Sequence, residues 1–125
     1  MELHESTEDY LEAILNIKNN QGYVRSVDIA THMNVTKPSI TYATKKLKEA
    51  GFIDTDTNGM IFLTNEGSKI ANDVWEKHKT LSSFFVLLGV KEKQAMIDAC
   101  KVEHDLSNET FKAIKNFVKN NANSK

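Results

Sequence analysis

The segment from residue 26 to residue 63 constrains the fold of this chain most, because it signals four elements in a fixed order. Two short helical patterns flank a tight turn at residues 34–36, and Gly51 ends the second of them at the usual left-handed cap. Asn58 and Gly59 then mark a hairpin turn between two strand-like runs. Helix, turn, helix and hairpin in this order predict a winged helix-turn-helix.

Helical spacing of apolar residues predicts four further helices, at residues 7–20, 64–88, 91–104 and 108–120. The last three carry more large apolar side chains than one small lobe can bury, so we expect a second copy of the chain to cover them. The chain is therefore expected to be mainly α. An N-terminal winged helix-turn-helix domain (residues 1–65) should be followed by a three-helix dimerisation domain (residues 66–125).

The composition is that of an ordinary soluble globular protein, with 40% hydrophobic and 26% charged residues. No apolar run approaches the roughly 18 residues that a membrane helix needs, and the acidic, polar N-terminus does not resemble a signal peptide. The single cysteine excludes an intrachain disulfide. These features favour a cytoplasmic protein with no membrane partner.

Charge is distributed unevenly although the net charge is only −1. No acidic residue lies between Asp28 and Glu49, and that interval contains four lysines. In a helix-turn-helix the second helix enters the major groove with its N-terminal residues at the base edges, while lysines neutralise phosphates. The predicted contacts to double-stranded DNA are Arg25, Thr36, Lys37, Pro38, Ser39, Thr41, Tyr42, Lys45 and Lys46.

A second pattern, near the C-terminus, points to metal chemistry. Cys100, Glu103 and His104 are spaced i, i+3 and i+4, which places a thiol, a carboxyl and an imidazole on one helix face. These groups together form a transition-metal ligand set. Each alone has a plainer interpretation, because a single cysteine is usually buried filler and a Glu-His pair is usually solvated surface.

Further metal donors lie elsewhere in the chain: Asp9 and Glu12 share one face of the first helix, and His78 lies on the long helix. With these included, the sequence resembles the diphtheria-toxin-repressor and manganese-transport-regulator family of metal-dependent repressors over nearly its whole length. The resemblance rests on residues 7–12, Asp28-Ile29-Ala30, Pro38-Ser39, Leu63-Thr64 with Gly67, Lys77-His78, and residues 100–107.

The resemblance implies a ligand set that mixes two branches of the family. In the manganese-regulating branch the ligands fall on Asp9, Glu12, His78, Glu103 and His104, with a glutamate in place of Cys100. The iron-regulating branch has the cysteine, but usually has methionine in place of Asp9 and a non-ligand in place of Glu12. All six residues are therefore predicted ligands. The expected cofactor is Fe²⁺ or Mn²⁺, with Fe²⁺ slightly favoured and with Co²⁺ and Zn²⁺ as substitutes.

Two features of larger relatives are expected to be missing. The ancillary site of the iron branch uses His78, but its other side chains correspond to Ser82 and Met96, which are poor ligands. The SH3-like domain of larger members is also expected to be absent, since the chain stops after the sixth helix.

The resemblance implies that metal acts as a corepressor, orienting a homodimer on palindromic operator DNA that controls metal-uptake genes. The alternative is a winged-helix regulator similar to the MarR family that senses a small molecule, or a redox signal through Cys100. No small organic ligand is expected under the first hypothesis. An enzyme is not expected, because the sequence contains neither a nucleophile elbow nor a Gly-rich phosphate loop.

Overall fold

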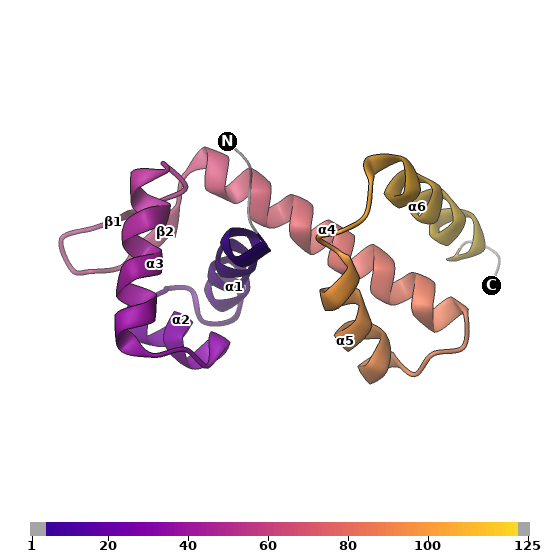
Figure 1. The fold of residues 1–125 in the computed structure, drawn as a ribbon, viewed down its shortest axis with the longest axis horizontal. Helices are drawn as coiled ribbons and strands as arrows, with labels where there is room; N and C mark the ends of the chain where they lie inside the picture. The colour runs from indigo at the N-terminus through magenta and orange to yellow at the C-terminus, as the bar shows by residue number, and fades with distance from the viewer. Residues whose placement is uncertain (1–4, 123–125) are drawn as a thin grey trace. The chain divides into compact units, whose positions relative to one another are not determined.

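A computed structural model describes residues 5–122. Its elements are α1 (Glu5–Gln21), α2 (Ser26–Met33), α3 (Lys37–Glu49), β1 (Ile53–Thr55), β2 (Ile61–Leu63), α4 (Asn65–Leu87), α5 (Glu92–Val102) and α6 (Asn108–Ala122) (Figure 1). The mainly helical fold predicted from sequence is confirmed. No helix in residues 5–122 combines the length and apolarity needed to cross a membrane.

The chain divides into two compact units, Met1–Asn72 and Asp73–Lys125. The division falls within α4, whereas the predicted domain boundary at residue 65 is where α4 begins. The ends of the two predicted domains, residues 1–4 and 123–125, lie outside the described residues. The boundary at residue 65 stays a prediction.

The helix-turn-helix of the first unit forms through local caps. Thr36 precedes α3, and its Oγ1 accepts a hydrogen bond from the Ser39 N–H at 3.3 Å. Asn34 ends α2 in the left-handed conformation, with φ of 56°. This conformation reverses the chain between the two helices within three residues, as the turn at residues 34–36 predicts.

The wing is an antiparallel hairpin in which Ile53 pairs with Leu63 and Thr55 pairs with Ile61. Its strands have three residues each, shorter than the strand-like runs in the sequence. Asp56 explains the difference, because its Oδ1 accepts hydrogen bonds from the N–H groups of Asn58 at 2.8 Å and Met60 at 3.0 Å. The side chain thus takes over donors that a longer strand ladder would use.

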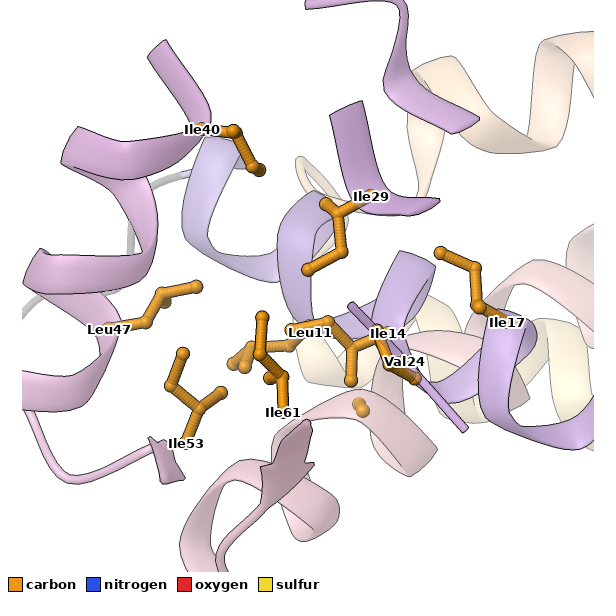
Figure 2. Packing of buried hydrophobic residues seen from close by; sticks show 10 residues of the cluster. Leu11, Ile14, Ile17, Val24, Ile29, Ile40, Leu47, Ile53 and Ile61 are labelled. Atoms are coloured by element: carbon orange, nitrogen blue, oxygen red, sulfur yellow. The ribbon is translucent and has the colours of Figure 1, made fainter. Parts of the chain in front are cut away.

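The core of the first unit collects apolar side chains from every element of that unit (Figure 2). Full burial of each Ile or Leu contributes about 1.5–3 kcal/mol relative to exposure, so this cluster holds the helix-turn-helix and the wing together. The cluster consists of Leu11, Ile14, Ile17, Val24, Ile29, Ile40, Leu47, Ile53, Ile61 and Ala71.

The second unit, taken by itself, buries fewer large side chains. Leu81 of α4 and Ala95 and Ala99 of α5 are buried, and Phe84 meets Phe117 of α6 edge to face at 5.7 Å between ring centroids. Many large apolar side chains of this unit stay exposed: Val86, Leu87, Leu88, Met96, Ile97 and Phe117. Such a surface is typical of an interface with another protein.

Candidate metal centre and DNA-reading face

Glu103 is a carboxylate that the structure buries, with only 1% of its surface exposed. It follows α5 as the C-cap residue, and its N–H donates to the carbonyl oxygen of Ala99 at 3.0 Å. Its helical backbone keeps the one-face spacing that the sequence indicates. Burying a carboxylate is costly unless cations or donors compensate it. The groups around Glu103 must therefore compensate its burial.

Two imidazoles of the second unit face the two oxygens of Glu103. Nδ1 of His78 lies 3.0 Å from Oε2, and Nε2 of His104 lies 3.5 Å from Oε1. Within residues 5–122, Oε1 is buried and has no hydrogen-bond donor in acceptable geometry. One carboxylate flanked by two imidazoles, with a buried lone-pair oxygen, fits a divalent transition-metal ion. The structure thus brings together three of the predicted ligands.

His78 is held by aromatic packing on α4. Its ring stacks on Trp75 with centroids 5.5 Å apart and planes 13° from parallel. The stack leaves the His78 side chain 13% exposed and limits rotation of the imidazole. Trp75 is not among the predicted site residues, although its i, i+3 spacing from His78 on a helix was a usable signal.

Cys100 lies on α5 one turn before Glu103, but its side chain is exposed. Its role as a ligand stays a prediction.

His78, Ser82 and Met96 line a hollow of about 540 Å³ in the second unit. A hydroxyl and a thioether are weak ligands for hard divalent ions, which is the reason for expecting that the ancillary site is lost. That loss also stays a prediction.

Asp9 and Glu12 belong to α1 in the first unit, where both side chains are half-buried. Leu11 and Ile14 of the same helix point into the core, and this fixes the rotation of α1 about its axis. The i, i+3 spacing then places the two carboxyl groups on a shared face. The first unit therefore presents a pair of oxygen donors, and their assignment as ligands stays a prediction.

The outer face of α3 is the candidate DNA-reading surface. Ile40 and Leu47 are buried on its inner side, so the residues between and opposite them face outward. α3 contains no acidic residue until Glu49 at its end, which leaves this face positive. The predicted contacts exposed on it are Lys37, Pro38, Ser39, Thr41, Tyr42, Lys45 and Lys46.

Two hydroxyl groups around the start of α3, those of Thr36 and Thr41, already donate hydrogen bonds within this segment. Thr36 donates to Ser39 Oγ at 2.9 Å, and Thr41 donates to the Lys37 carbonyl oxygen at 2.9 Å. Since a hydroxyl has one proton, neither can donate to a base without breaking its present bond. Thr36 and Thr41 thus have structural roles in addition to the DNA contacts predicted for them.

The charged side chains around α3 differ in their surroundings. Lys48 donates to Thr55 Oγ1 of the wing at 3.1 Å and lies 3.9 Å from Asp54. Arg25, just before α2, is exposed, and its N–H donates to Asp28 Oδ2 at 2.9 Å. Lys48 therefore ties α3 to the wing, whereas the Lys45 side chain extends from the outer face.

A winged helix-turn-helix and a buried carboxylate–imidazole cluster in one chain define the class of metal-responsive DNA-binding regulators. Residues 2–59 match the family model of the iron dependent repressor N-terminal DNA binding domain. Residues 64–124 match the model of the iron dependent repressor metal binding and dimerisation domain. The chain therefore belongs to the iron-dependent repressor family, which includes the diphtheria toxin repressor and MntR proteins.

Individual relatives agree with this assignment. The chain is 37% identical over 118 residues to the uncharacterized HTH-type transcriptional regulator MJ0568 of Methanocaldococcus jannaschii, covering 93% of this chain and 94% of the relative. It is 34% identical over 120 residues to the transcriptional regulator MntR of Salmonella typhimurium, covering 96% and 76%. A manganese-dependent transcriptional repressor solved with manganese superposes with a TM-score of 0.83 at 25% identity, over 90% of this chain and 52% of that one. The chain thus spans about half the length of that solved protein.

The family assignment decides between the hypotheses drawn from the sequence. The chain is a metal-dependent transcriptional repressor and not an enzyme. The matches support this function over the MarR-like alternative. The resemblance inferred from scattered motifs is confirmed.

Proposed function

We propose that Fe²⁺ or Mn²⁺ is the corepressor, and that it fixes a homodimer in the arrangement that fits a palindromic operator upstream of metal-uptake genes. The observation that carries this proposal is the buried Glu103 carboxylate between His78 and His104. A divalent ion there would supply the positive charge that balances the carboxylate and would accept the imidazole lone pairs. Those three residues are the core of the proposed ligand set.

Asp9 and Glu12 of α1 complete the proposed ligand set, together with Cys100. Ligands would then come from the DNA-binding unit as well as from the second unit. Metal binding would favour those arrangements of the two units that fit an operator. Thermodynamic linkage requires that operator DNA then tightens metal binding by the same factor.

Dimerisation is proposed to use the apolar surface of the second unit. Leu87, Met96 and Phe117 are 40–48% exposed there, and Leu87 and Met96 also line the hollow of about 540 Å³. A second copy would cover these side chains, and its twofold axis would match the palindrome of the DNA. The matching family model describes this part of the chain as a metal binding and dimerisation domain.

The proposed function is tested by selecting duplex DNA from a random library with the protein under anaerobic conditions, separately with Fe²⁺, with Mn²⁺ and with chelator. We expect enrichment of a palindromic sequence with metal and none with chelator. A thiolate ligand favours Fe²⁺, so Cys100→Ser should weaken the Fe²⁺ response more than the Mn²⁺ response. Equal enrichment with chelator would overturn the corepressor role, and a response to Mn²⁺ alone would reject the preference for Fe²⁺.

Lys45 and Lys48 provide a matched pair for the DNA-reading face. Lys45→Ala should lower the slope of log affinity against log salt by about one for each protomer, because one phosphate contact is lost. Lys48→Ala should leave the slope unchanged, since the Lys48 ammonium is bound to Thr55 of the wing. The slopes are measured by fluorescence anisotropy with the selected DNA. An unchanged slope for Lys45→Ala would contradict its assignment to phosphate.

A further inference from the structure

Tyr42 is the large apolar side chain on the outward face of α3, with 64% of its surface exposed. Exposure of an aromatic ring to water is unfavourable. The residue lies in the second turn of α3, on the face opposite Ile40 and Leu47, which are buried. In a helix-turn-helix this face points into the major groove.

The other side chains of this face are poorly placed to identify a base by donating hydrogen bonds. Thr36, Thr41 and Thr44 each donate their hydroxyl proton within the helix segment, at 2.9 Å in all three cases. The lysines are flexible point charges suited to phosphates. Ser39 Oγ accepts the Thr36 proton and can still donate its own. For an apolar group of a base, the largest exposed partner on this face is the Tyr42 ring.

The Tyr42 ring also contacts a lysine of the same helix. Nζ of Lys46, one turn further along α3, lies 5.5 Å from the ring centroid in a cation–π contact. This contact occupies part of the ring and leaves the rest of its apolar surface exposed. An ammonium beside the ring would also suit a phosphate near the base that the ring meets.

Resting on the proposed function, we infer that Tyr42 reads the 5-methyl group of a thymine in the operator. The C5 methyl of thymine is the apolar group that a base pair displays in the major groove, so it is the natural partner of an aromatic edge. Tyr42 thereby determines specificity for thymine through apolar contact, and its hydroxyl is not required.

Uracil substitution tests this inference, because uracil differs from thymine only by the missing methyl. The probe is the duplex selected by the wild-type protein with metal, with each symmetric thymine pair replaced in turn. At one position the loss of a buried methyl should weaken binding about fourfold per half-site, or about sixteenfold for the symmetric pair. Tyr42→Ala should bind the thymine and uracil duplexes equally, while Tyr42→Phe should still prefer thymine.

Tyr23 supplies the matched control, since it is a tyrosine 49% exposed outside α3. Tyr23→Ala should keep the wild-type preference for thymine. If every uracil duplex binds the wild-type protein as well as thymine does, or if Tyr42→Ala keeps the preference, the assignment of Tyr42 is wrong and the proposed function stands. If no duplex is selected with metal, both are wrong.

Discussion

Glu103→Gln should abolish metal-dependent DNA binding while leaving the protein folded. The substitution keeps the shape of the side chain and removes the charge that His78 and His104 flank. Loss of groups that merely orient metal ligands costs about 10–100-fold in metal affinity, so loss of the central carboxylate should cost at least about 100-fold. The measurement is anisotropy of labelled operator DNA across a metal titration, with thermal unfolding of the apo-protein measured alongside.

Two comparisons make the Glu103 result specific. Glu109→Gln removes a carboxylate from an exposed position in the first turn of α6 and should leave the metal response unchanged. His104→Ala should lose the response as Glu103→Gln does, with its fold retained. A Glu103→Gln protein that binds operator at the wild-type metal concentration would contradict the proposed centre. An unfolded Glu103→Gln protein would show instead that the carboxylate has a structural role.

Gly67→Ala should destabilise the first unit by at least about 3 kcal/mol, a large share of the stability of a small domain. A Cβ at Gly67 would lie against the Phe52 carbonyl group, 2.8 Å from its carbon and closer still to its oxygen. This carbonyl cannot easily move away, because its oxygen accepts a hydrogen bond from the Thr64 N–H at 3.0 Å. Urea unfolding followed by circular dichroism measures the change.

Gly51→Ala is the control for the Gly67 experiment, because a Cβ at Gly51 would meet nothing within 4 Å. Its φ of +84° still disfavours alanine, so a cost of about 1–2 kcal/mol is expected. The difference between the two variants therefore separates steric clash from backbone conformation. Equal free energies of unfolding for Gly67→Ala and Gly51→Ala would rule out the close approach of α4 to Phe52.

Most of the fold could be predicted from short-range signals. The helix predicted at residues 64–88 is α4 (Asn65–Leu87). Thr64 caps it by accepting a hydrogen bond from the Gly67 N–H at 3.2 Å. The helix predicted at residues 91–104 ends earlier, at Val102. Caps and apolar periodicity act within one or two turns, so these elements can be recognised without tertiary contacts.

The site was harder to predict, because its parts are far apart in the chain. His78 and Glu103 are 25 positions apart in the chain, and the geometry of a single helix or turn does not predict a contact over that separation. The family resemblance grouped them, whereas the structure supplied the 3.0 Å approach and the stacking of Trp75 on His78. The hydrogen bonds of Thr36 and Thr41 within α3 were likewise not evident from residue type alone.

The sequence by itself determined the order of elements, the winged helix-turn-helix and the kinds of donor available for metal. These depend on neighbouring residues, whose geometry a helix or turn sets directly. Only the tertiary structure decided which metal donors are buried. It also decided that the Lys48 side chain binds the wing and that the Tyr42 side chain is exposed on the outer face of α3. Burial and long-range contact arise from packing between elements. A Glu-His pair on a helix can therefore be solvated surface in one fold, whereas in this fold its glutamate, Glu103, is buried.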